Sequence, residues 1–319
     1  MTEANSRYKI YLAPMQGFTD HVYRNNFATV FGEIDKYFCP YLSYEKPGVV
    51  KKSQLKDIMP GNNVTSKMIP QILFSDVEEF KGLVKEIIGF GYSEINLNMG
   101  CPYPMVTNRG RGAALLQKLS VVDEVLKITQ NDLSVAVSIK LRSGLESDQE
   151  IFRVVETINQ HQISEIVFHP RVAKQMYKGN VDVNLFKQVA DISTHPMVYN
   201  GDILCSEDIK EVLNLVPTQS SWMIGRGILQ NPFLAQQLKG IENRRVEMNE
   251  KLARFHEMMF SDYASKLEGN GHLLQKMEQF WSYFSASFTN QHKTFKLIKK
   301  ANSIEKYNDA VHRIFADFL

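Results

Sequence analysis

The chain has 319 residues, of which 44% are hydrophobic and 23% charged, as is typical of a protein that folds around its own core. This length suffices for one large domain and a smaller one. The formal net charge of +2 excludes a strongly basic or acidic chain, so charge alone does not indicate a nucleic-acid partner, although a local basic patch remains compatible with it.

The three cysteines, Cys39, Cys101 and Cys205, are far apart and form no Cys-x-x-Cys pair. This excludes a zinc ribbon or a disulfide framework and indicates a reduced, cytoplasmic chain. Residues 1–7 hold no apolar signal region, and no apolar run approaches the ~20 residues that span a membrane. The carboxylates show no metal-ligand spacing, so we predict no catalytic metal.

Short apolar or β-branched runs alternate with amphipathic segments along the first 240 residues. We predict strands over residues 10–15, 36–40, 68–73, 94–98, 135–141, 165–169, 197–200 and 221–224. Predicted helices between them include residues 77–89, 121–131, 149–160 and 208–215. Eight strands that alternate with helices over about 230 residues predict an α/β fold, a (β/α)8 TIM barrel.

After Gly240 the pattern becomes purely helical. Phe255, Met259 and Tyr263 follow one another at helical spacing, and the glycines at 269 and 271 predict a break between two helices. We therefore predict two domains, a catalytic barrel over residues 1–240 and a small all-helical domain over residues 241–319.

The loop after the fourth predicted strand carries a lone cysteine in the stretch Asn98-Met99-Gly100-Cys101-Pro102. Glycine permits close approach of the backbone to a ligand, and proline stiffens the chain after the thiol. A free cysteine is by default a small buried side chain. Its place at the carboxyl end of a barrel strand, where barrel enzymes hold their catalytic groups, favours a catalytic Cys101. We expect Cys39 and Cys205 to be structural.

Side chains alternate along a strand, so the apolar face of residues 137–141 should meet the helices. Lys140 then points into the barrel and Arg142 lies at its mouth. Lys140 could instead pair with a buried carboxylate such as Glu94, and His169 could bond a backbone carbonyl. The same alternation directs polar side chains inward from five strands, which predicts a polar ligand: Gln71, Asn96, Asn98, Lys140, His169 and Asn200.

The last two strands end in glycine-rich turns. Asn200-Gly201-Asp202 follows the seventh strand, and Gly225-Arg226-Gly227 follows the eighth. Loops at these two positions often bind phosphate in this fold, through backbone amides and a guanidinium group. The sequence therefore predicts a phosphate group near Arg226.

At these residues the chain resembles the tRNA-dihydrouridine synthases. The helical tail resembles that family's tRNA-binding domain in type and position, and the arrangement is most similar to the bacterial C-type subgroup. The matching stretches, in order, are Leu12-Ala13-Pro14-Met15-Gln16-Gly17-Phe18-Thr19-Asp20, Asn98-Met99-Gly100-Cys101-Pro102, Lys140-Leu141-Arg142-Ser143-Gly144, Asn200-Gly201-Asp202 and Gly225-Arg226-Gly227.

The resemblance implies FMN in the barrel mouth, NADPH or NADH as electron donor, and a uridine of tRNA as substrate. It implies hydride transfer from flavin N5 to C6 of the base and proton transfer from Cys101, a neutral thiol, to C5. The target uridine must first leave its stacked position. Asn98, Arg142 and Tyr177 would contact the uracil. The implied flavin contacts are Pro14, Met15, Gln16, Gln71, Lys140, His169, Asn200, Gly201, Asp202, Gly225 and Arg226.

The chain departs from the family pattern at His169-Pro170-Arg171, where many relatives carry His-Gly-Arg. Proline stiffens this turn and removes an amide donor, which puts the contact near His169 in doubt.

The tail holds twelve Lys or Arg and ten Asp or Glu, and its lysines gather near the end, at residues 293, 296, 299, 300 and 306. On charge alone these lysines fit a solvated helix surface, so tRNA binding rests on the resemblance, which predicts strong salt dependence. Most aromatic residues of the run 280–284 fit a helical core better than base stacking.

Three other functions stay open: a flavin-dependent reductase of a small pyrimidine or enone, a flavin-free lyase with Lys140 as Schiff-base amine, and a non-catalytic RNA-binding protein. Nothing in the sequence demands more than a monomer.

Overall fold

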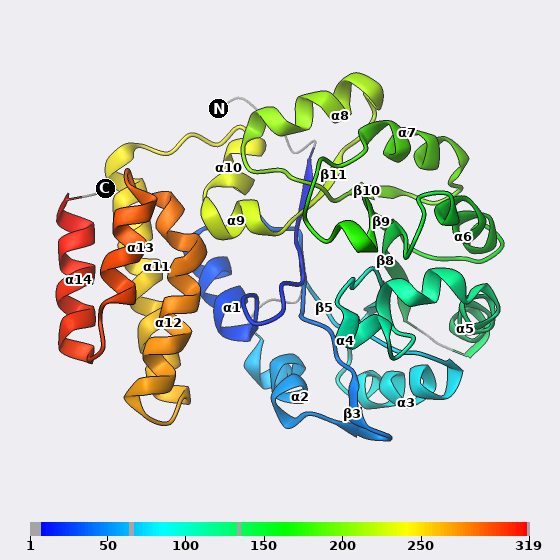
Figure 1. Ribbon diagram of the computed structural model, residues 1–319, viewed down its shortest axis with the longest axis horizontal. Helices are drawn as coiled ribbons and strands as arrows, with labels where there is room; N and C mark the ends of the chain where they lie inside the picture. Colours follow the sequence, from blue (N-terminus) through cyan, green and yellow to red (C-terminus); the bar gives the residue numbers. More distant parts are fainter. Residues whose placement is uncertain (1–7, 64–66, 133–134, 318–319) are drawn as a thin grey trace.

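The computed structural model describes residues 8–63, 67–132 and 135–317, which form a parallel barrel flanked by a helical tail (Figure 1). The strands are β1 (Lys9–Leu12), β2 (Lys36–Phe38), β5 (Met68–Ile69), β6 (Gln71–Ile72), β7 (Glu94–Met99), β8 (Ala136–Gly144), β9 (Ile166–Val172), β10 (Met197–Tyr199) and β11 (Ser221–Ile224). Their order in the sheet is β5-β2-β1-β11-β10-β9-β8-β7-β6, and each pair is parallel.

The two ends of this sheet are the halves of one strand. β5 and β6 flank Pro70, which has no N–H to donate to the sheet. Residues 68–72 therefore pair with β2 on one side and with β7 on the other, which closes a barrel of eight strand positions. The predicted (β/α)8 barrel is confirmed. A small antiparallel hairpin of β3 (Tyr44–Lys46) and β4 (Val49–Val50) was not predicted.

Most predicted elements lie within two residues of the observed ones. The barrel helices are α1 (His21–Val30), α2 (Lys52–Ile58), α3 (Val77–Ile88), α5 (Leu119–Asp132), α6 (Glu150–Ile158), α7 (Val183–Ile192), α8 (Ile209–Leu215), α9 (Arg226–Gln230) and α10 (Leu234–Leu238), with a short α4 (Pro104–Thr107) in the loop after β7. The prediction was wrong for the end of β1. Ala13 makes the last sheet bond, to Ile224, and Pro14 cannot donate one.

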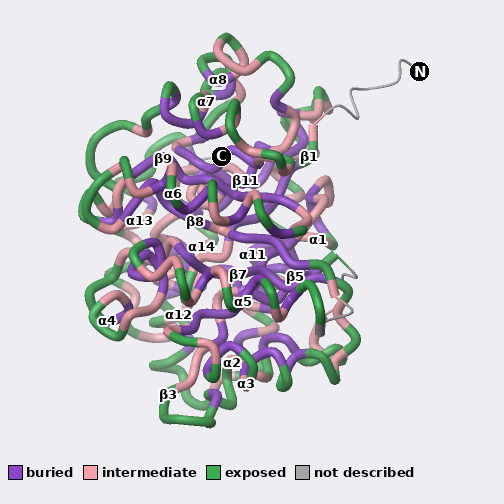
Figure 2. Tube along the Cα trace, turned by 90° about the vertical axis from the view of Figure 1, so that its right-hand side faces the viewer, coloured by how far each residue is buried: buried purple, intermediate pink, exposed green. Residues whose placement is uncertain are grey.

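The barrel interior is divided into an ionic floor, an apolar layer and a polar mouth. At the floor, Lys36 Nζ pairs with Glu94 at 2.8 Å and with Glu165 at 2.9 Å. Glu94 thus pairs with Lys36 and not with Lys140, which removes the alternative partner considered for Lys140. Above the floor lies an apolar cluster of Tyr11, Ala13, Phe38, Ile69, Val167, Val198 and Met223. Figure 2 shows that the barrel strands are mostly buried.

The tail consists of α11 (Arg245–Lys266), α12 (Asn270–Phe284), α13 (Gln291–Lys299) and α14 (Ile304–Asp317). Gly269 has φ +85°, and the predicted helix break there is confirmed. Phe255 of α11 packs edge-on against Tyr23 and Phe27 of α1 and against Phe31, which follows α1. The predicted domain boundary near residue 240 falls between α10 and α11, and the division into two domains stays a prediction. No helix within the described ranges is long and apolar enough to cross a membrane.

Candidate active site

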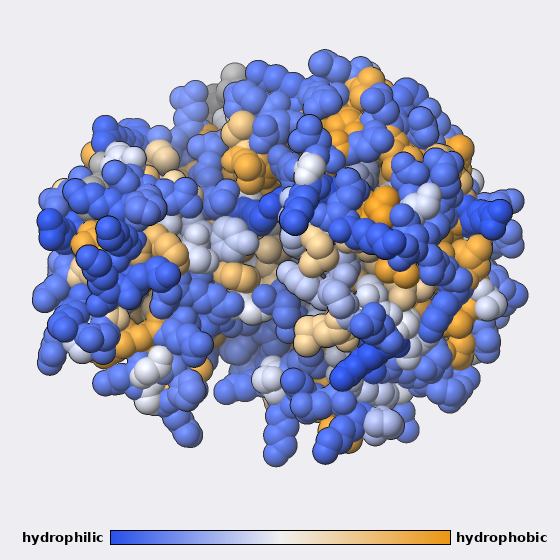
Figure 3. Space-filling model, in the orientation of Figure 1, coloured by the Kyte–Doolittle hydropathy of each residue, from blue (hydrophilic) through white to orange (hydrophobic). Residues whose placement is uncertain are grey.

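A cavity of about 320 Å³ opens at the carboxyl ends of the barrel strands. Figure 3 shows this face hollowed near its centre, between the tail and the barrel helices. Of the residues predicted from the sequence, Gln71 and Asn96 do not line the cavity. It brings together the others: Pro14, Met15, Gln16, Asn98, Cys101, Lys140, Arg142, His169, Tyr177, Asn200, Gly201, Asp202, Gly225 and Arg226. The inward direction predicted from strand alternation is therefore confirmed for Lys140, Arg142, His169 and Asn200.

The Cys101 loop is held by backbone contacts that only glycine permits. Gly112 has φ +59°, and a Cβ there would lie 2.7 Å from the Cys101 carbonyl oxygen and 2.9 Å from Cys101 Cβ. Ala113 N–H donates to the same carbonyl at 3.1 Å. The segment around Gly112 therefore packs directly against the cysteine and fixes the backbone that carries the thiol.

The Cys101 thiol is neutral near pH 7. Burial raises its pKa above the ordinary value of 9.0, against smaller opposing effects that include the charges of Arg142 and Lys140 and a hydrogen bond with the Tyr41 side chain. A neutral thiol satisfies the requirement for a proton donor.

Lys140 and Arg142 supply positive charge next to the thiol. Burial, with the charge of Arg142 adding to it, lowers the pKa of Lys140 to about 7. Arg142 Nη1 donates to the Val172 carbonyl at 3.2 Å, and its guanidinium carbon lies 5.4 Å from the centre of the Tyr177 ring. An anion placed beside Lys140 would restore its charge.

His169 is buried and presents an unsatisfied nitrogen. Its Nε2 has no hydrogen-bond partner in the described part of the chain, and burial holds its pKa well below the usual range, with nearby cations adding to the effect. A buried polar atom without a partner is costly, and because His169 lines the cavity, a ligand there could supply the missing hydrogen bond. Asn200 Nδ2 donates to the Met223 carbonyl at 2.8 Å, which fixes the orientation of its amide group.

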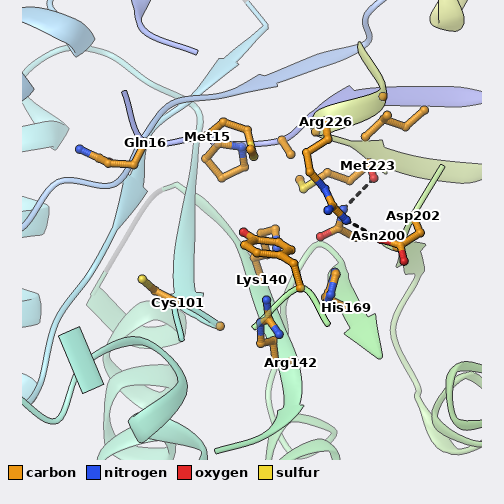
Figure 4. A pocket seen from close by; sticks show the side chains of 18 of the residues that line it. Met15, Gln16, Cys101, Lys140, Arg142, His169, Asn200, Asp202, Met223 and Arg226 are labelled. Carbon is orange, nitrogen blue, oxygen red and sulfur yellow. Dashed lines mark hydrogen bonds and ion pairs between the residues drawn. The ribbon is translucent and has the colours of Figure 1, made fainter. Parts of the chain in front are cut away.

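Asp202 lies at the cavity wall, where its carboxylate forms ion pairs with two arginines. Its Oδ1 accepts from Arg226 Nη2 at 2.6 Å (Figure 4). Oδ1 also accepts from Arg171 Nη1 at 2.9 Å, and Oδ2 pairs with Arg171 as well. Although burial opposes it, the hydrogen bonds and charge of Arg171, with that of Arg226, lower the pKa of Asp202. Asp202 therefore orients Arg226, and its role as a cofactor contact stays a prediction.

Arg171 is the main functional residue that sequence reasoning missed. It is buried, holds Asp202 and thereby sets the position of Arg226. The signal was present in His169-Pro170-Arg171, but only the proline of that stretch was considered. Pro170 lies near an irregularity in the pairing of β8 with β9, where β9 continues to Val172, beyond its predicted end.

The cavity wall also contains tyrosines that were not predicted from the sequence. Tyr41 follows β2, Tyr103 precedes α4, and Tyr283 comes from α12 of the tail. Tyr283 contacts the ring of Phe18 edge-on, with ring centres 5.0 Å apart. Its neighbours Phe280, Trp281 and Phe284 are buried in the helical core, as expected for most of that aromatic run.

Gln71 is brought near the site without entering it. Its side chain is fully buried and bonds Asn96 and Asn98 behind the cavity wall. The flavin contact of Gln71 that the resemblance implies stays a prediction.

The donor set fits an elongated ligand with an anionic end. Among the described residues that line the cavity, Lys140, Arg142 and Arg226 are basic and Asp202 is the single carboxylate, which also pairs with Arg171. Tight turns at Gly201 and Gly225 lie by the arginines, and a Cβ on Gly225 would lie 3.1 Å from Met15 Sδ. Figure 4 shows Gln16 and Cys101 on one side of the cavity and Arg226, Asn200 and Asp202 on the other. Within the described ranges, no group of three or more His, Cys, Asp or Glu side chains is arranged to hold a metal ion.

Comparison with known proteins agrees with this arrangement. The family model described as Dihydrouridine synthase (Dus) matches residues 11–317. A tRNA-dihydrouridine(16) synthase of Neisseria meningitidis serogroup B is 25% identical over 330 residues, which cover 99% of this chain and 96% of the relative. A tRNA-dihydrouridine synthase B of Pasteurella multocida is 29% identical over 234 residues, covering 73% of this chain and 69% of the relative. A solved structure of a variant of NCR from Zymomonas mobilis, at 11% identity and TM-score 0.50, covers 75% of this chain and 89% of its own and is similar in fold alone.

Proposed function

The chain belongs to the dihydrouridine synthase family, and from this premise we propose that it reduces one uridine of tRNA to 5,6-dihydrouridine, with FMN as cofactor and NADPH or NADH as electron donor. The observation that carries the proposal is the meeting of a neutral Cys101 thiol with Lys140 and Arg142 in one cavity. Family membership favours this reaction over the flavin-free lyase and the non-catalytic RNA-binding protein.

The unsatisfied Nε2 of His169 and the surplus of arginine support an anionic cofactor such as FMN. Arg226 and the turns at Gly201 and Gly225 would hold its phosphate, and Asn200 and His169 its ribityl chain. Pro14, Met15 and Gln16 would cover the flavin ring from the end of β1, with Lys140 at its polar edge. When bound and reduced, FMN would supply the hydride.

Cys101 would donate the proton to C5 of the uracil, since burial keeps the thiol protonated. Arg142, fixed by Val172, would stabilise the negative charge that develops on the base. Tyr177, whose ring lies near both Arg142 and Arg226, would contact the flat face of the uracil.

The substrate of this site would be a uridine extruded from folded tRNA. The match to the tRNA-dihydrouridine(16) synthase runs through the tail, whereas the match to synthase B covers 73% of the chain. Because the tail would orient the RNA against the barrel, this difference supports position 16 as the target. A tRNA substrate also supports a cytoplasmic enzyme.

The direct test is product analysis. The purified protein is incubated with NADPH and tRNA that lacks dihydrouridine, and the tRNA is digested and analysed by mass spectrometry. We expect the gain of two hydrogen atoms at uridine 16, and no gain with Cys101→Ala protein of equal flavin content. Reduction of free uridine or of a small enone, with tRNA left unchanged, would instead establish the small-molecule reductase.

A further inference from the structure

The segment that follows β1, residues 15–20, folds into a tight turn that we name the β1 turn. Thr19 Oγ1 accepts a hydrogen bond from Met15 N–H at 2.8 Å. The N–H groups of Phe18 and Thr19 donate to the Met15 carbonyl at 2.9 and 3.0 Å. On the barrel side, the buried Arg24 donates through Nη1 to the Thr19 carbonyl at 2.7 Å. The shape of this turn decides where the Met15 side chain stands in the cavity.

The tail holds the same turn from its other side. Lys276 Nζ donates to the Gly17 carbonyl at 2.7 Å and pairs with Asp20 Oδ2 at 3.0 Å. The hydroxyl group of Tyr263 donates to the Asp20 carboxylate at 2.9 Å, and Lys276 Nζ lies 4.9 Å from the centre of the Tyr263 ring. Only 19% of the Lys276 side chain is exposed, so its ammonium group is held mainly by these contacts and not by water.

The packing of α12 against the β1 turn is as close as its polar contacts. Lys276, Gln279 and Tyr283 lie three and four residues apart, so they share one side of this helix. Gly17 has φ +84°, and a Cβ there would lie 2.8 Å from Gln279 Nε2. The rings of Phe18 and Tyr283, which both line the cavity, meet edge-on. The tail therefore fits the turn by shape as well as by charge.

We propose that Lys276 and Tyr263 are positioning residues, through which the tail sets the shape of the β1 turn and thereby the affinity of the cavity for flavin. Met15 and Gln16 of this turn would cover the flavin ring. A turn that is already held in shape loses less conformational freedom when the ligand binds. Beyond orienting tRNA, the tail would thus complete the cofactor site. The inference rests on the proposed function only in taking FMN as the ligand.

The test replaces one tail side chain and measures the turn and the cofactor separately. Lys276→Met removes the ammonium group and keeps an unbranched apolar chain. Hydrogen–deuterium exchange of residues 15–20, followed by mass spectrometry on flavin-free protein, reports on the turn itself. Titration with FMN, followed by flavin fluorescence, gives the dissociation constant. We expect several-fold faster exchange of the turn and a dissociation constant raised about tenfold.

Lys251→Met is the matched control, because it changes the charge equally and also removes a lysine of the tail. Lys251 Nζ donates to Asn243 Oδ1 at 2.8 Å and lies 6.0 Å from the centre of the Phe233 ring, without touching the β1 turn. It should leave both the exchange of the turn and the affinity for FMN as in the parent. If Lys276→Met does not fold, Tyr263→Phe carries the test, with a smaller effect in the same direction.

Three results would overturn the inference. Exchange of the turn as slow in Lys276→Met as in the parent would mean that the tail does not hold it. Faster exchange with unchanged FMN affinity would mean that the turn does not set that affinity. Equal effects of Lys276→Met and Lys251→Met would indicate a general loosening of the tail. A parent protein that binds no FMN would contradict the proposed function, while exchange still decides whether the tail holds the turn.

Discussion

At the scale of single residues, burial rather than residue type decides what each group in the cavity can do. It keeps the Cys101 thiol protonated and lowers the pKa of Lys140 to about 7, although both lie within one small space. Strand alternation predicted that Lys140 points inward, because that depends on local geometry alone. Strand alternation could not predict that Asp202 pairs with two arginines or that Asn98 bonds Gln71. Those pairings arise only when separate strands are brought into register.

Lys140 leads to a pH prediction for cofactor binding. With a pKa of about 7 in the free protein, Lys140 is charged below pH 7 and neutral above it. An anionic ligand raises this pKa, so binding takes up a proton above pH 7, and affinity should fall as pH rises, by up to about tenfold per pH unit. We expect this for reduced FMN, measured anaerobically by ultrafiltration between pH 7 and 9. In Lys140→Met this part of the pH dependence should vanish. Equal slopes in the two proteins would show that Lys140 does not face the anion.

At the scale of elements, hydrophobic periodicity was sufficient to place the barrel strands and four of its helices. The last strand, β11, has the bounds expected from its sequence, Ser221–Ile224. The periodicity could not show how the tail docks, because docking depends on which side chains of separate elements meet, and these include polar contacts. Tyr263 of α11 donates to the carboxylate of Asp20 at 2.9 Å, and Lys276 of α12 pairs with it at 3.0 Å. Asp20 also caps α1 by accepting from Tyr23 N–H.

Replacing Asp20 therefore measures how much the contacts between the tail and the barrel contribute to the free energy of unfolding. Asp20→Ala removes a helix cap and the two tail contacts, so the free energy of unfolding should fall by about 2–3 kcal/mol in urea denaturation. Asp182→Ala is the control, because Asp182 caps α7 through Leu185 N–H without touching the tail, and it should cost about 1 kcal/mol. Equal losses in the two variants would mean that the tail contacts contribute nothing to stability.

At the scale of the whole molecule, the tail is part of the cavity wall as well as a neighbour of the barrel. Tyr283 of α12 lines the cavity, and Lys276 donates to the carbonyl of Gly17, in the loop that carries Met15 and Gln16. Lysines at 293, 296, 299, 300 and 306 are all exposed on or beside α13 and α14. We propose that these exposed lysines contact the phosphate groups of the tRNA.

Charge reversal tests that surface. Lys296→Glu, Lys299→Glu and Lys300→Glu together should weaken tRNA binding and reduce the slope of log affinity against log salt by about 0.7–0.9 for each phosphate group that the protein no longer neutralises. Filter binding between low and moderate salt measures both. The control triple, Lys85→Glu, Lys127→Glu and Lys210→Glu, reverses exposed lysines on barrel helices and changes the net charge equally. If both triples weaken binding alike, the effect comes from net charge, and α13 has no special role.

The measurement that tests the central claim most directly is the visible absorption spectrum of the purified protein under anaerobic conditions, before and after NADPH and then tRNA lacking dihydrouridine. If reduced flavin is the reductant of uridine, the purified protein should be yellow and NADPH should bleach it. Addition of tRNA should restore the colour, with one uridine consumed per flavin reoxidised. A protein that stays bleached with tRNA, or that remains colourless after incubation with FMN, would contradict the account.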